Sequence, residues 1–225
     1  MIRDRRLRLA NLLLPTRGDR QVATGFVLCG LIIFGVLSWY VRDVRATRLD
    51  LLVDGLFRLR PMWIDSILSP ATEMLGPLRV VAAGFVFSVL CFVVGEVRAA
   101  ALSIVGPPAA LLITELWLKP VLDRPPVSGQ GDAFPSGHAT AAFALSIVVS
   151  LLLRRQGAVG RHLATVPRVL GLVLAVLVPI YLSGALALFR HHYITDILGG
   201  LAVGGSVVLM VAIAFDLLGI DEPDC

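Results

Sequence analysis

Two short segments, far apart in the sequence, carry side chains that could do chemistry. Residues 135–138 (Pro-Ser-Gly-His) stand at the start of one long apolar run, and His192 stands four residues before Asp196 at the start of another. A carboxylate that accepts a hydrogen bond from one imidazole nitrogen fixes the tautomer and leaves the other nitrogen more basic, which suits a nucleophile. The alternative interpretation is a histidine and an aspartate that lie separately at a water interface.

The segment 135–138 has the composition of a helix N-terminus that binds an anion. Proline is preorganised for a first helical turn, and the free backbone N–H groups of that turn attract phosphate. Gly137 would let a phosphate approach the backbone closely, and the Ser136 hydroxyl would add a donor. His138 is then placed to protonate a leaving oxygen. A capping serine beside an interfacial histidine is the alternative.

Two cationic residues precede this segment. Lys119 is the only lysine of the chain, and Arg124 follows it closely. Arginine holds phosphate oxygens in a bidentate fork, whereas lysine acts as a point charge. A lysine beside a membrane span can equally be a cation that reaches for water. No metal-ligand spacing appears, so we expect neither a metal nor another cofactor.

The composition predicts an all-α integral membrane protein. The chain has 225 residues, of which 57% are hydrophobic and only 16% are charged, and its mean hydropathy is +0.85. A soluble domain carries nearer a quarter charged residues. No polar block is long enough to fold alone, so residues 1–225 form a single membrane-embedded domain. No basic stripe with interleaved aromatic residues appears, and we expect no nucleic-acid partner.

Apolar runs of membrane-spanning length predict six transmembrane helices. Residues 1–20 form an N-terminal segment, and residues 42–79 are mixed in charge and predict a surface-lying or re-entrant helical segment between the first and second spans. The predicted spans are 21–41, 80–95, 99–117, 135–153, 169–189 and 197–215.

The number of crossings places the polar residues on one side of the membrane. Between His138 and His192 the chain crosses twice, so both histidines face the same side. A cytoplasmic N-terminus puts eleven Arg and Lys residues inside and nine outside. We therefore expect both termini in the cytoplasm and the site on the outer face of a bacterial-type inner membrane. Gly200 and Gly204 form a small-xxx-small pair, which serves packing within one chain or a homodimer.

These segments together resemble the type 2 phosphatidic acid phosphatase (PAP2) superfamily. Its signature combines a Lys…Arg-Pro segment, Pro-Ser-Gly-His, and Ser-Arg followed by a histidine with an aspartate four residues later. The matching stretches are 119–126, 135–138 and 183–196. Two departures stand out. Arg124-Pro125 lies two residues earlier than the family's Arg-Pro, and Leu186 replaces the family's third-segment arginine, for which Arg190 is a candidate substitute.

The resemblance implies metal-independent hydrolysis of a lipid phosphate or pyrophosphate, such as phosphatidic acid, phosphatidylglycerol phosphate or a polyprenyl phosphate. His192, oriented by Asp196, would attack phosphorus to form a phosphohistidine, and His138 would protonate the departing lipid oxygen. Membrane lipids are then both the surroundings and the source of substrate. The residues that the resemblance assigns to the phosphate are Lys119, Arg124, Ser136, Gly137 and Arg190.

Two other functions are compatible with the sequence. A catalytically impaired family member that binds or moves phospholipids would explain Leu186 and the displaced arginine. A small transporter with a proton-relay histidine is less favoured, because histidines of a transport path lie near the middle of the membrane, whereas His138 and His192 lie at the ends of spans.

Overall fold

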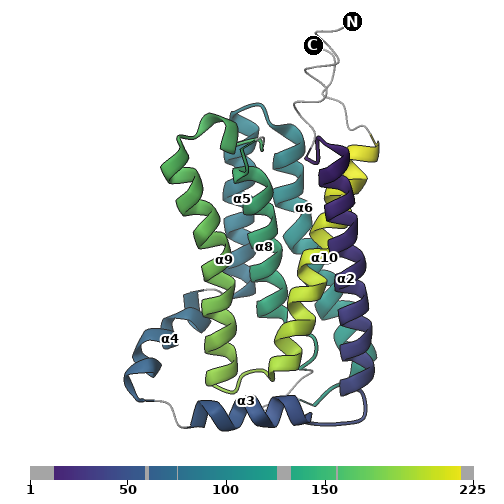
Figure 1. The fold of residues 1–225 in the computed structure, drawn as a ribbon, viewed down its shortest axis with the longest axis vertical. Coiled ribbons are helices and arrows are strands. Elements are labelled where there is room, and N and C mark those ends of the chain that lie inside the picture. Colours follow the sequence, from purple (N-terminus) through teal and green to yellow (C-terminus); the bar gives the residue numbers. More distant parts are fainter. Residues whose placement is uncertain (1–12, 59–60, 75, 126–132, 156, 219–225) are drawn as a thin grey trace, which may run out of the picture.

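The computed structural model describes residues 13–58, 61–74, 76–125, 133–155 and 157–218, and every regular element within these ranges is a helix. Long helices run side by side as one bundle, and a short helix, α3, lies across one end of it (Figure 1). The predicted all-α fold is therefore confirmed for the described residues.

In the described part of the chain, six apolar helices form the bundle, and each overlaps one predicted span. Four helical stretches are long and apolar enough to cross a membrane, namely α2, α9, α10 and the continuous run Val97–Leu122. The helices α5 and α8 are apolar but shorter, with 17 residues each. The bounds are α2 Arg17–Val41, α5 Pro77–Val93, α6 Val97–Ile113, α8 Gly137–Leu153, α9 Thr165–Leu188 and α10 Ile194–Leu218.

The helix α6 does not end where the hydropathy falls. A π-helical turn, η1 (Thr114–Leu118), continues it, and α7 (Lys119–Leu122) follows directly. The predicted span 99–117 ends before Lys119, but this lysine is helical, and the chain leaves the helix only at Asp123, whose φ of 41° is left-handed. A π turn adds one residue to a helical turn and is frequent at functional sites.

The segment 42–79 contains two helices, α3 (Arg48–Arg58) and α4 (Trp63–Met74). α4 packs against α9, and α3 crosses the end of the bundle below α9 and α10 (Figure 1). The sequence predicted a surface-lying or re-entrant segment here, and the orientation of α3 across the bundle end agrees with the first of these.

The helix α3 turns its polar side toward the protein. Its Asp50 is 2% exposed, whereas Leu49, Leu52 and Leu56 are 40%, 68% and 74% exposed. Thr47 begins the helix, because its hydroxyl accepts a hydrogen bond from the Asp50 amide (3.2 Å) while its own amide donates to the Asp50 carboxylate (2.9 Å). An inward aspartate and outward leucines are the reverse of a helix on a soluble protein.

The contact between α8 and α10 brings the two predicted site segments together. Gly200 and Gly204 of α10 face the α8 backbone, and a Cβ at Gly200 would lie only 2.5 Å from the Ser136 carbonyl oxygen. The Ser136 amide donates a hydrogen bond to the carbonyl of Asp196 at 2.9 Å. This glycine pair thus serves packing within one chain, and a homodimer stays a prediction.

Candidate active site

His138 and His192 lie side by side at the end of the bundle that α3 crosses, and the residues around the two rings form the candidate site. Their ring centroids are 6.4 Å apart, with the ring planes at 56° to each other. His138 lies in the first turn of α8, and His192 lies in the bend that precedes α10. The two imidazoles, which are 54 residues apart in the sequence, are thus neighbours in the fold.

The side chain of Asp196 lies behind His192. The Nδ1 atom of His192 is buried, and Asp196 Oδ2 is 3.8 Å away, which is longer than a hydrogen bond. Asp196 lies in the first turn of α10, which begins at Ile194, whereas His192 lies two residues before the helix. Catalytic hydrogen bonds are often long before substrate binds, so a small rotation of the imidazole would close this one.

The first turn of α8 forms the floor of the pocket. The Ser136 hydroxyl caps the helix by accepting a hydrogen bond from the Ala139 amide at 3.4 Å, and its own proton is left to donate to an anion. A Cβ at Gly137 would collide with the carboxylate of Glu115, so a larger residue there would require that the Glu115 side chain moves. Both residues thus stand where the sequence places an anion cradle.

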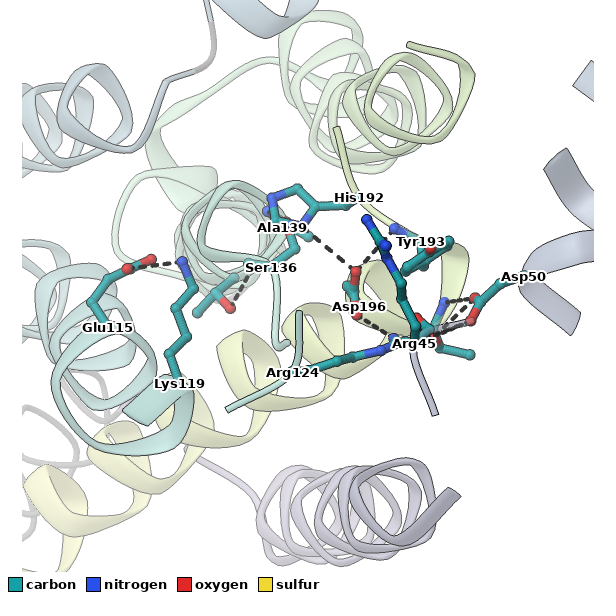
Figure 2. A network of polar contacts seen from close by, with 12 residues as sticks. Arg45, Asp50, Glu115, Lys119, Arg124, Ser136, Ala139, His192, Tyr193 and Asp196 are labelled. Carbon is teal, nitrogen blue, oxygen red and sulfur yellow. Dashed lines mark hydrogen bonds and ion pairs between the residues drawn. The ribbon is translucent and has the colours of Figure 1, made fainter. Parts of the chain in front are cut away.

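Lys119 approaches this turn from the end of α6. Its Nζ lies 2.9 Å from Glu115 Oε2, one helical turn earlier. Figure 2 shows the pair on the far side of Ser136 from Arg124. Glu115 lies against the first turn of α8, because its side chain occupies the space next to Gly137. Sequence reasoning missed Glu115, although a lone acid inside an apolar run, four residues before the only lysine, was a usable signal.

Arg124 is enclosed by protein. Its guanidinium carries an ion pair to each of two buried carboxylates, those of Asp50 (2.8 Å) and Asp196, and its NH1 donates to the Thr195 hydroxyl at 2.7 Å. It also lies 4.7 Å from the centre of the Tyr193 ring. The sequence assigned Arg124 to the phosphate, but a direct contact through its terminal nitrogens requires that these interactions break.

Asp50 and Thr195 complete this buried cluster, and sequence reasoning missed both. The Asp50 carboxylate accepts hydrogen bonds from the Thr195 amide (3.1 Å) and hydroxyl (2.9 Å). Burial opposes the charge of Asp50, but hydrogen bonds from Thr47, Arg124 and Thr195 outweigh burial and hold the pKa of Asp50 below its ordinary value. Asp50 is therefore ionised at neutral pH.

Arg190 lies at the rim of the pocket. Its side chain is 55% exposed and pairs with Asp54 of α3 at 2.9 Å, and its backbone is left-handed, with φ at 59°. Arg190, Asp54 and His192 line one small hollow. The arginine is thus near the nucleophile that the sequence predicts, although it is held by α3 and not turned toward α8.

Residues 54–218 match the PAP2 superfamily, which is most of the chain. The chain belongs to the PAP2 superfamily. The crystal structure of a transmembrane PAP2-type phosphatidylglycerolphosphate phosphatase from Bacillus subtilis has the same fold, with a TM-score of 0.70 at 16% identity over 87% of this chain and 98% of that one. No curated protein matches this chain in sequence. The apolar helices and the shared membrane fold identify an integral membrane protein.

This PAP2 protein departs from the family signature at a position in its core. Leu186, where the signature has an arginine, is 1% exposed and packs among apolar residues that include Leu182 and Ile197. Its carbonyl accepts hydrogen bonds from the amides of His191 (3.0 Å) and His192 (3.3 Å). The backbone at Leu186 therefore shapes the bend that carries His192, while its side chain contributes no charge.

Proposed function

We propose that this PAP2 protein hydrolyses a lipid phosphate or diphosphate at the membrane surface through a phosphohistidine intermediate. The observation that carries the proposal is the 6.4 Å approach of the His138 and His192 rings beside the capped first turn of α8. One imidazole then stands on each side of a phosphate, as nucleophile and as acid. The α8 amides and Lys119 supply the positive field that holds its oxygens.

The reaction takes place in two steps. His192 Nε2 attacks phosphorus, the bond from phosphorus to the lipid oxygen breaks, and protonated His138 gives its proton to that oxygen. Water then attacks the phosphohistidine, gives its proton to neutral His138, and frees His192 and inorganic phosphate. Asp196, 3.8 Å from His192 Nδ1, stabilises the positive charge that forms on the imidazole during the first step.

An apolar groove supports a lipid substrate. It lies between α5, α8 and α9, has a volume of about 250 Å³, and is lined by residues such as Phe87, Ala142 and Val149. Ala142 follows His138 by four residues, which is about 6 Å along a helix. A phosphate held at His138 would thus place its hydrocarbon chain at the mouth of this groove.

The basic residues at the far end of the bundle support a membrane orientation with the site outside. Arg154 pairs with Asp19 at 3.0 Å and Arg161 pairs with Glu96, so loops far apart in sequence share that end. We propose that this end and both termini are cytoplasmic, that all six apolar helices span a bacterial inner membrane, and that the outward leucines of α3 lie in the lipid interface.

Phosphate release from purified protein in detergent micelles tests the proposal. Wild-type protein is expected to release inorganic phosphate from at least one of phosphatidic acid, phosphatidylglycerol phosphate and a polyprenyl diphosphate. His192→Ala is expected to abolish release. His162→Ala is the matched control, because His162 lies in η2 (Gly160–His162), beyond the opposite end of α8. No release by the wild type, or equal release by the two variants, would remove the proposal.

A second function has one observation in its favour. A PAP2 protein that binds or moves phospholipids without cleaving them needs the anion-binding first turn of α8. It does not need every arginine that the family signature assigns to the phosphate, and Leu186 has replaced one of these. In that case His192→Ala would leave phospholipid binding intact, and wild-type protein would release no phosphate. The phosphate-release experiment therefore separates the two functions.

A further inference from the structure

Asp50 reaches from α3 into the part of the chain that carries His192. Its carboxylate accepts hydrogen bonds from both the amide and the hydroxyl of Thr195, at 3.1 and 2.9 Å. The first amides of a helix have no partner within that helix. Thr195 is the second residue of α10, so Asp50 caps α10 from another element.

Arg124 connects Asp50 to Asp196. One terminal nitrogen donates to Asp50 at 2.8 Å, and the other donates to Asp196 and to the Thr195 hydroxyl. The other Asp196 oxygen accepts from the Tyr193 amide at 2.9 Å. Both oxygens of Asp196 are therefore held, and the carboxylate is fixed in the orientation that it presents to His192 (Figure 2).

The cluster is closed to solvent and to substrate. The side chains of Asp50, Arg124 and Asp196 are each at most 1% exposed, and Thr195 is fully buried. Asp50 borders the small hollow beside His192, but its carboxylate is occupied by hydrogen bonds from Arg124 and Thr195. Any effect of these two residues on the reaction must pass through the position of Asp196 and the bend at His192.

We propose that Asp50, with Thr195 and Arg124, forms a clamp that positions Asp196 and the start of α10 for attack by His192. The inference rests on the proposed hydrolysis. Asp50 lies outside residues 54–218, which match the family, whereas Arg124 and Thr195 lie within them. Asp50, Thr195 and Arg124 are positioning residues, because they act through Asp196 and touch no reacting atom. Displacement of a catalytic group by about 1 Å can reduce a rate about a hundredfold.

The sharpest test removes one hydroxyl. Thr195→Val keeps the shape of the side chain but loses the hydroxyl that hydrogen-bonds both Asp50 and Arg124, and Thr195→Ser keeps that hydroxyl. With the lipid phosphate that the wild type cleaves fastest, Thr195→Val is expected to lower kcat about tenfold with KM within about threefold. Thr195→Ser is expected to restore kcat to within about threefold of the wild type.

Asp50→Asn tests the charge, and Asp43→Asn is its control. Asp43 pairs with Arg42 on the surface, and its side chain is 78% exposed. Asp50→Asn should lower kcat by about ten- to a hundredfold with little change in KM, while Asp43→Asn changes neither. Each kcat is divided by the fraction of protein that is folded at the assay temperature, and thermal unfolding measures that fraction. A loss of stability is then not mistaken for a loss of positioning.

The outcomes separate the inference from the function on which it rests. If the wild type is active and kcat of Thr195→Val and Asp50→Asn stays within twofold of it, the positioning role is overturned and the hydrolase remains. An equal fall in kcat for Thr195→Val and Thr195→Ser would also overturn it. A wild type without phosphate release would remove the proposed function and the clamp's role together.

Discussion

Two ion-pair systems flank His192, and they differ in their access to water. Lys119 and Glu115 pair at 2.9 Å, with side chains 16% and 39% exposed. Arg124 pairs with Asp50 and Asp196, and none of these three side chains is more than 1% exposed. An exposed pair contributes little stability and exchanges partners readily, whereas a buried pair resists separation. The first system is thus suited to receive an anion and the second to hold the site in shape.

The largest effect on stability is expected when the buried Arg124–Asp50–Asp196 ion pairs are broken. Arg124→Met has a similar length but leaves the Asp50 and Asp196 carboxylates buried without their cation, which is expected to lower the free energy of unfolding by about 3–5 kcal/mol. Thermal or denaturant unfolding in detergent measures the change. Arg42→Met is the control, because Arg42 pairs with Asp43 and both side chains are exposed. Equal stability of the two variants would contradict the view that Arg124 holds the site in shape.

Loss of the partly exposed Lys119–Glu115 pair should affect activity more than stability. Lys119→Met is expected to lower kcat/KM by about ten- to a hundredfold, because one charged phosphate contact is lost. Its free energy of unfolding should change by at most about 1 kcal/mol. Steady-state phosphate release and thermal unfolding of the same preparation measure both. A variant that loses stability but keeps kcat/KM would assign Lys119 to the scaffold and not to the substrate.

The smallest effect concerns Glu115. Its carboxylate competes with an incoming anion for Lys119, so Glu115→Gln is expected to tighten inhibition by vanadate about two- to fivefold. The inhibition constant is measured against the lipid phosphate that the wild type hydrolyses, with Asp123→Asn as a control for removal of an acid at the exposed end of the same helix. Weaker inhibition by vanadate in Glu115→Gln would show that this acid supports the anion site.

The sequence predicted the helices well because apolar runs are a local signal. Each predicted span coincides with a helix, and the number of crossings between His138 and His192 placed both imidazoles at one end. Hydropathy contains no signal for the π turn at Thr114–Leu118, so the helical position of Lys119 was missed. The predicted span 197–215 begins three residues after the observed start of α10 at Ile194, and the bend that carries His192 depends on hydrogen bonds to the Leu186 carbonyl, for which hydropathy contains no signal.

The buried partners of the site were beyond the reach of a single sequence. Asp50 and Arg124 are 74 residues apart, and no spacing rule connects them. Thr47 and Asp50 can be recognised as a helix-capping pair, but that pattern alone gives Asp50 a local role. Only the position of α3 across the end of the bundle shows that the same carboxylate also caps α10 and pairs with Arg124.

The central claim is that His138 and His192 bind one phosphate between them, and a structure of the protein with orthovanadate tests it most directly. Vanadate imitates five-coordinate phosphorus. The account predicts vanadium bonded to His192 Nε2, with His138 on the opposite side and with Lys119 Nζ and the first amides of α8 at hydrogen-bond distance from its oxygens. Vanadate bound away from His192, or a pocket that stays without it at concentrations that saturate inhibition, would contradict the account.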